Sequence, residues 1–229
     1  MQNNVKSASE IAKMRKAAAI TDDVFDAVVA ALREGVTEKE IADLVLAETL
    51  RLGGSGVSFD TIVAFGESGA EPHHVPTDKR LEKGMLVTVD MGTVFEGYDS
   101  DFTRTVAFGE PTDEQREIYS VVLEAQRRAL AAVADGASCR EVDAAARGYI
   151  SECGYGDKYI HGTGHGVGTE IHESPTLNAA SGEVLAAGQV VTVEPGIYIA
   201  GRMGVRIEDM VLVGEGVPFS RHSTALAVL

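Results

Sequence analysis

The chain has 229 residues, of which 45% are hydrophobic, and its 20 basic and 35 acidic residues give a net charge of −15. This hydrophobic content is enough for a substantial buried core and argues against a disordered chain. The acidic balance argues against nucleic acid, whose phosphates need a positive surface, and against anionic membranes.

No segment has the pattern of a leader or a membrane span. The first ten residues lack the apolar core of a signal peptide, and no stretch approaches the ~20 continuous apolar residues that cross a bilayer. The two cysteines, Cys139 and Cys153, do not form a close metal-binding pair and fit a reducing compartment better than a disulfide scaffold. We interpret both as ordinary helix residues and expect a cytoplasmic protein.

The first half of the chain predicts two helices followed by two strands. A capping box at Ser7 opens a helix with apolar residues on one face, and Thr37 caps a second helix. Glycines stop both helices. Apolar, β-branched runs over residues 84–92 and 102–108 predict the strands.

The second half repeats this order. Thr112 opens a capping box, Ser138 caps the next helix, and strands are predicted over residues 188–196 and 205–213. The repeat is half the chain long, too long for a solenoid. It predicts a duplicated unit in which two sheets meet and helices cover their outer face. Because no low-complexity linker divides the halves, residues 1–229 are predicted to form one domain.

Four carboxylates stand at the ends or starts of the predicted strands. Asp90 and Glu194 each follow an apolar strand in equivalent positions of the two halves, and Asp101 begins another strand. Strand alternation places Glu208 on the face opposite Ile207. One such carboxylate alone is usually a turn residue or an ion-pair partner. Four gathered together would repel one another, and divalent cations would remove that repulsion.

Histidines are the second group of candidate site residues. Five of the chain's six lie in two loops bounded by glycine or proline, namely His73, His74, His161, His165 and His172. Glycine lets a backbone pass close to a metal or a ligand. One imidazole with four carboxylates suits Mn(II), Co(II), Fe(II) or Zn(II). Two such ions about 3.5–4 Å apart can hold both oxygens of a tetrahedral intermediate.

Six motifs together resemble the M24, or pita-bread, metallopeptidases. In chain order they are Val89-Asp90-Met91-Gly92, Ser100-Asp101-Phe102-Thr103-Arg104-Thr105, His161-Gly162-Thr163-Gly164-His165-Gly166-Val167-Gly168, His172-Glu173-Ser174-Pro175, Glu194-Pro195-Gly196 and Arg206-Ile207-Glu208-Asp209. Within that family the second and last motifs resemble aminopeptidase P and Xaa-Pro dipeptidase (prolidase). The resemblance implies an α+β pita-bread fold: two pseudo-two-fold-related helix-helix-strand units and a curved, mainly antiparallel sheet covered by helices.

The resemblance also implies a role for each matching residue. Two divalent metal ions, manganese foremost, would be held by Asp90, Asp101, His165, Glu194 and Glu208. Glu194 would also move a proton, and His73 and His172 would contact the substrate and stabilise the intermediate, with His73 preferred over its neighbour His74. His161 would lie at the cleft wall near the proline or the terminal carboxylate of the substrate. Arg206 would orient a ligand carboxylate.

The implied reaction is hydrolysis of the peptide bond before proline, in a peptide with proline second. The family's usual N-terminal domain is missing ahead of the first helix, which indicates either an excised domain or a short natural relative. Specificity and a possible homodimer therefore stay open, as does the choice between the two proline-specific activities. Three alternatives remain: methionine aminopeptidase activity, a non-catalytic binding module of the same fold, and creatinase-like hydrolysis without metal. A complete five-ligand set disfavours the last two.

Overall fold

The computed structural model describes residues 4–229, so residues 1–3 of the predicted domain lie outside the described residues. Helices and short strands alternate along it. In chain order these are α1 (Ala8–Ala31), α2 (Glu38–Arg51), β1 (Gly56–Val57), β2 (Ile62–Phe65), the 3-10 helix η1 (Gly66–Ala70), β3 (Met85–Met91), β4 (Thr93–Phe95), β5 (Tyr98–Asp99), β6 (Phe102–Phe108), α3 (Asp113–Ala132), α4 (Cys139–Glu152), the 3-10 helix η2 (Gly156–Lys158), β7 (Gly164–Gly166), β8 (Glu173–Leu177), β9 (Val190–Val193), β10 (Gly196–Ile199), β11 (Met203–Arg206) and β12 (Asp209–Leu212).

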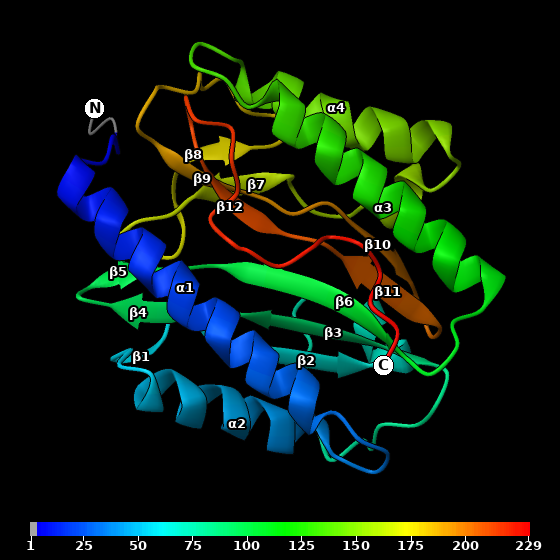
Figure 1. Cartoon of the computed structure of the whole chain (residues 1–229). Helices are drawn as coiled ribbons and strands as arrows, with labels where there is room; N and C mark the ends of the chain where they lie inside the picture. The colour runs from blue at the N-terminus through cyan, green and yellow to red at the C-terminus, as the bar shows by residue number, and fades with distance from the viewer. Residues whose placement is uncertain (1–3) are drawn as a thin grey trace.

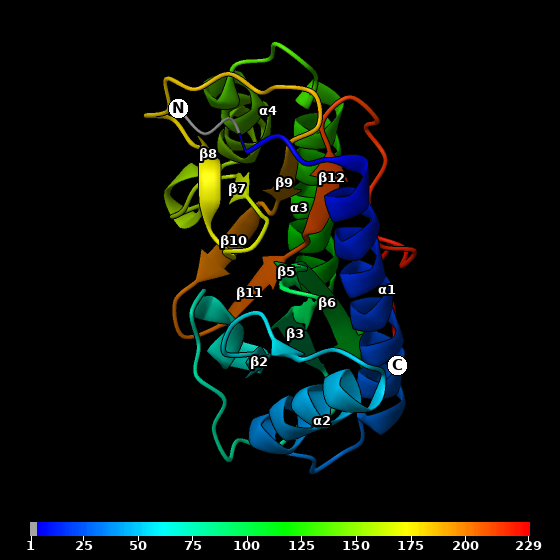
Figure 2. The ribbon, with the colours of Figure 1, turned by 90° about the vertical axis from the view of Figure 1, so that its left-hand side faces the viewer.

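The predicted order of helix, helix and strands holds in both halves (Figure 1). Helices α1 and α2 flank the strands of the first half, and α3 and α4 flank those of the second half. A quarter turn of the view places α1 and α3 on the same side of the strands (Figure 2). The strands thus lie between the two helix pairs, with one face covered by helices, which is the α+β arrangement expected from the sequence.

Helix starts follow the predicted caps, with one correction. The side chains of Ser7, Thr37 and Thr112 each accept a hydrogen bond from the main chain three residues on, and complete capping boxes form. Ser138 occupies the cap position of α4, but its side chain makes no capping bond. The amide of Glu141, which a capping hydroxyl would bind, donates instead to the main-chain carbonyl of Ser138, at 2.9 Å. The main chain therefore satisfies this donor without the serine hydroxyl.

Each half holds a central antiparallel sheet. In the first half β3 lies between β2 and β6, and Thr88 pairs with Thr105. In the second half the order is β12-β9-β7-β8. Two smaller sheets, β1-β4-β5 and β10-β11, complete the described strands, and all of these strand pairs are antiparallel.

The predicted continuous strand over residues 205–213 is wrong, because it is two strands with a break. Strand β11 ends at Arg206 and pairs with β10, whereas β12 begins at Asp209 and pairs with β9. Glu208 lies in the break, where its amide donates to the carbonyl of Thr103 in β6, at 3.1 Å. The chain changes sheets here, and the break places Glu208 against the first half of the molecule.

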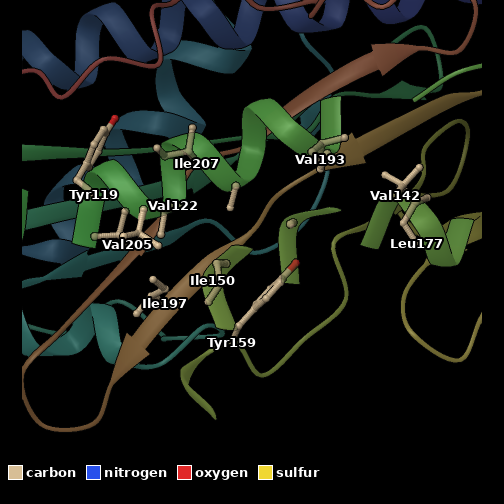
Figure 3. Close-up of a cluster of buried hydrophobic side chains, with 14 of the residues drawn as sticks. Tyr119, Val122, Val142, Ile150, Tyr159, Leu177, Val193, Ile197, Val205 and Ile207 are labelled. Atoms are coloured by element: carbon tan, nitrogen blue, oxygen red, sulfur yellow. The ribbon is translucent and has the colours of Figure 1, made fainter. Parts of the chain in front are cut away.

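Two apolar clusters match the two halves, and α1 joins them. The larger contains buried residues of α3, α4 and β9–β11, among them Ile150 and Val205, which are fully buried (Figure 3). The second lies between α1, α2 and the sheet of β3. Met14 of α1 packs instead with Val190 and Met210 of the second half. Among residues 4–229, no helix is long and apolar enough to cross a bilayer.

Candidate metal centre

Strand pairing brings the four carboxylates to the junction of the two halves. Asp90 lies in β3 opposite Thr103 of β6, and Asp101 directly precedes β6. Glu194 follows β9 and is fixed by its amide, which donates to the carbonyl of Thr163 at 2.8 Å. Glu208 reaches the same place because its bridge to Thr103 joins β6 to the break between β11 and β12.

Three of the five predicted ligands form a compact group. Asp101, His165 and Glu208 each offer one ligand atom, and these atoms lie within 4.8 Å of one another. Nε2 of His165 is 3.5 Å from Oδ2 of Asp101 and 3.3 Å from Oε1 of Glu194. A fourth predicted ligand, Glu194, therefore adjoins the group through His165.

The fifth predicted ligand, Asp90, is paired at one oxygen only. Nη2 of Arg206 donates to Oδ2 of Asp90 at 2.6 Å, and both side chains are buried. Oδ1 of Asp90 is buried without a hydrogen-bond partner. A buried carboxylate oxygen is costly to leave unpaired, and a cation would satisfy it.

The electrostatics of the group favour a bound cation. Burial is the main reason that the pKa of Asp101 lies well above its usual value, and the charges of Asp90 and Glu194 raise it further. The pKa of Glu208 is raised in the same way, by burial and then by Asp101, Glu194 and Asp90. Burial lowers the pKa of His165, which keeps its imidazole neutral and able to bind a metal. The donor set therefore fits divalent metal ions.

Two threonine hydroxyls, not identified from the sequence, orient these carboxylates. Oγ1 of Thr103 donates to Oε2 of Glu208 at 2.6 Å, and Oγ1 of Thr192 donates to Oε1 of Glu194 at 3.0 Å. Thr192 also accepts from the amide of His165, at 3.0 Å. Thr192 precedes Glu194 by two residues, so strand periodicity places both on one face. The two-residue spacing between Thr192 and Glu194 is the feature of the sequence that could have identified Thr192.

His161 belongs to a network that also contains Tyr198, which the sequence did not reveal. Nδ1 of His161 is 2.7 Å from the carbonyl of Gly162, so Nδ1 carries the proton and Nε2 is an acceptor. The hydroxyl of Tyr198, 2.7 Å away, therefore donates to Nε2 and accepts from Nη1 of Arg206 at 2.9 Å. Both ring nitrogens of His161 are engaged. Tyr198 follows Gly196 in an apolar strand, and nothing in that pattern distinguished it from a core residue.

The two histidines of the His73-His74 pair have different surroundings. His74 is buried, and its Nε2 lies 2.8 Å from Oε2 of Glu38 in α2. His73 is exposed, as is His172. Burial lowers the pKa of both His161 and His172, and the nearby charge of His73 lowers each further. His73 therefore lies near enough to His161 and His172 to influence both electrostatically, whereas His74 packs against α2.

His172 lies directly against His165. Their ring centroids are 4.4 Å apart, with an interplanar angle of 63°. An exposed imidazole thus stands beside a partly buried one whose Nε2 lies near Asp101 and Glu194. The arrangement combines a candidate cation site among buried carboxylates with exposed imidazoles beside it.

Carboxylates and an imidazole gathered at the junction of the two halves of a duplicated α+β fold fit the class of metal-binding hydrolases. The sequence model of metallopeptidase family M24 matches residues 12–215, and the chain belongs to that family. An uncharacterized peptidase of Staphylococcus aureus strain MSSA476 is 44% identical over 220 residues, which are 96% of this chain and 63% of that protein.

Solved structures give the same result. An Xaa-Pro dipeptidase from Bacillus anthracis superposes with a TM-score of 0.97 at 44% identity, over 99% of this chain and 64% of that one. An X-Pro aminopeptidase from Thermotoga maritima MSB8 gives 0.96 at 41% identity, over 99% and 65%. A prolidase from Pyrococcus furiosus gives 0.94 at 44% identity, over 96% and 66%. The chain thus spans less than two thirds of the length of these relatives.

Proposed function

We propose that the chain is the catalytic domain of a metal-dependent exopeptidase that hydrolyses the peptide bond preceding proline. The observation that carries the proposal is the convergence of Asp101, His165 and Glu208, with ligand atoms within 4.8 Å of one another, in a member of family M24. The structural relatives named for action on Xaa-Pro peptides support the proline specificity.

Five residues would hold two divalent metal ions, namely Asp90, Asp101, His165, Glu194 and Glu208. Such ions lower the pKa of water and draw electron density from a carbonyl oxygen. We propose manganese, a metal that accepts this mixture of oxygen and nitrogen ligands, as do cobalt, iron and zinc. A homodimer and a cytoplasmic location remain predictions.

The chain's own residues would position the substrate and move protons. Burial raises the pKa of Glu194, so this carboxyl can take up a proton and release it to the departing nitrogen. Proline contributes a tertiary amide with no N–H, so its nitrogen must be protonated as it leaves. His73 and His172, exposed at the opening, would donate hydrogen bonds to the substrate carbonyl oxygen and stabilise its developing charge.

Arg206 and His161 would act around this centre. Arg206 holds one oxygen of Asp90 and so orients the other toward the centre. Because both ring nitrogens of His161 are engaged, the imidazole would offer its ring edge as an apolar wall for the proline side of the substrate.

The test is an assay of the manganese-loaded protein on an Xaa-Pro dipeptide, an Xaa-Pro-Yaa tripeptide and Met-Ala. We expect cleavage before proline, and the ratio of the first two rates separates dipeptidase from aminopeptidase specificity. Asp101→Ala should abolish metal binding and turnover and leave the circular dichroism spectrum intact. Cleavage of Met-Ala alone would indicate a methionine aminopeptidase, and full activity of Asp101→Ala would refute the metal site.

A further inference from the structure

The loop over residues 168–173, here called the histidine loop, joins β7 to β8 and carries His172. It begins with a tight turn, in which the amide of Gly168 donates to the carbonyl of Glu170 at 3.2 Å. It ends where Glu173 enters β8. The place of the His172 ring against His165 depends on how firmly this loop is held.

The carboxylate of Glu173 closes the loop on itself. Oε1 accepts from the amide of Thr169 at 2.9 Å and from the amide of Glu170 at 3.3 Å. Gly168 leaves the room for this, because a Cβ atom there would lie 2.2 Å from Oε1 of Glu173. Two main-chain amides of the loop are therefore held by a single carboxylate oxygen.

The second oxygen of that carboxylate is held from the N-terminal segment. Nζ of Lys6 lies 2.6 Å from Oε2 of Glu173, and the two side chains are only 7% and 13% exposed. Lys6 is itself fixed, since its amide donates to the carbonyl of Gly188 at 2.8 Å. A buried, well-oriented ion pair of this kind is strongly disturbed when one partner is removed, because the other charge is left unpaired.

The histidine loop borders a polar cavity. A cavity of about 520 Å³ is lined mainly by polar side chains, among them Lys6, Glu10, Tyr98, Glu170 and Glu173. If Lys6 were lost, the carboxylate of Glu173 could turn toward water in this cavity and release the two amides. The ion pair thus keeps the carboxylate of Glu173 turned toward the amides of the histidine loop and away from the cavity.

We propose that Lys6 is a positioning residue: through Glu173 it fixes the histidine loop and with it the imidazole of His172 against His165. The effect on turnover rests on the proposed function. The effect on the loop does not, because it concerns hydrogen bonds that exist whatever the reaction.

The first experiment measures the loop directly. Amide hydrogen exchange of Thr169 and Glu170 is followed by NMR in the full chain and in Lys6→Met, with Lys6→Arg as the conservative variant. Protection of these two amides should fall at least tenfold in Lys6→Met and recover in Lys6→Arg. Lys39→Met removes an exposed ion pair with Asp78, 3.0 Å long, and should leave both amides unchanged.

A second variant guards against a general loss of folding. Glu173→Gln keeps an oxygen that accepts from both amides but removes the charge that needs Lys6. Added to Lys6→Met, it should restore at least part of the protection, because no unpaired charge remains. Unchanged amide protection in Lys6→Met would overturn the proposal, and so would a double variant less protected than Lys6→Met alone.

The third measurement links the loop to chemistry at equal metal content. With an Xaa-Pro dipeptide, Lys6→Met should lose about tenfold in kcat with KM changed less than twofold, and Lys6→Arg should recover most of the rate. Lost amide protection with unchanged kcat would overturn the role in positioning His172. If the wild-type chain cleaves no Xaa-Pro peptide, the proposed function fails, and the exchange data alone decide whether Lys6 holds the loop.

Discussion

Arg206 donates to one oxygen of Asp90 at 2.6 Å and leaves the other oxygen of that carboxylate buried and unpaired. The same guanidinium donates to the hydroxyl of Tyr198 at 2.9 Å and to Oγ1 of Thr103 at 3.2 Å. Arg206 also donates to the carbonyl of Pro72 at 3.4 Å, so four contacts fix the plane of a guanidinium that engages one oxygen of the carboxylate. This geometry orients a metal ligand without occupying its free oxygen.

Arg206→Lys should test that orientation, since lysine keeps the charge but loses the planar fork that makes several contacts. We expect the free energy of unfolding to fall by about 1–3 kcal/mol, because buried partners are left unsatisfied. Manganese affinity should fall about 10-fold or more. Urea unfolding and calorimetric titration measure the two effects. Arg202→Lys, at an exposed pair with Glu114, should change stability by less than about 0.5 kcal/mol.

Asp101→Asn should separate the stability of the metal-free chain from that of the loaded chain. The substitution removes one negative charge from a buried group that also contains Glu208 and Glu194. Without metal, the variant should melt at or above the wild-type temperature, because repulsion is relieved. Manganese at about 100 times its Kd should stabilise the wild type by about 2.7 kcal/mol and the variant far less. An equal manganese-induced shift in both proteins would contradict the ligand role of Asp101.

Much of the fold could be predicted from the sequence, and so could the candidate residues of the centre, because the relevant signals are local. A carboxylate that follows an apolar strand is unusual, and Asp90 and Glu194 share that feature in both halves. Three helix caps were also local, as their bonds span three residues. Ser138 does occupy the predicted cap position, but its hydroxyl makes no capping bond, because the amide of Glu141 donates to the main-chain carbonyl of Ser138.

The contacts that could not be predicted join residues far apart in the chain. Glu38 and His74 lie 36 residues apart and meet inside the packing of α2. Tyr198 and His161 are 37 residues apart and meet at the centre. Neither pair has a spacing that periodicity can detect, since which side chains meet depends on how the two halves close. The strand break at Glu208 has the same origin.

Glu10 should make stability depend on pH in the acid range. Hydrogen bonds from the Ser7 hydroxyl and amide, followed by that from Tyr98, lower the pKa of Glu10 from 4.5 to about 2. Because the folded-state pKa is depressed, its contribution is present above about pH 4.5 and is lost as the pH falls toward 2. The melting temperature of metal-free Glu10→Gln should therefore lie below that of the wild type at pH 6, and the two should approach each other at pH 3. A difference that stays constant between these pH values would contradict this account.

Burial should make Cys139 unreactive in the folded chain. Its side chain is fully buried at the start of α4, and burial raises its pKa to about 11. The thiolate is the reactive form, so iodoacetamide at pH 8 should leave Cys139 unmodified until the protein unfolds. Mass spectrometry of peptides from native and urea-treated protein gives the measurement. Alkylation of native Cys139 at the rate of a free thiol would show that the first turn of α4 opens readily.

Gly204→Ala should be the most damaging of these substitutions, because it forces the two halves apart. A Cβ atom at position 204 in β11 would lie 1.9 Å from the carbonyl oxygen of Gly69 in η1, and a main-chain oxygen cannot turn aside as a side chain can. The strand would have to shift, and Arg206, two residues on, would move with it. We expect the free energy of unfolding to fall by about 3 kcal/mol or more, at the upper end of overpacking costs.

Gly148→Ala is the matched control. No atom lies within 4 Å of the added methyl on an exposed turn of α4, and the substitution should instead stabilise the protein by about 0.5–1 kcal/mol. Urea unfolding of both variants provides the comparison, and equal stability of Gly204→Ala and wild type would mean that η1 and β11 do not touch.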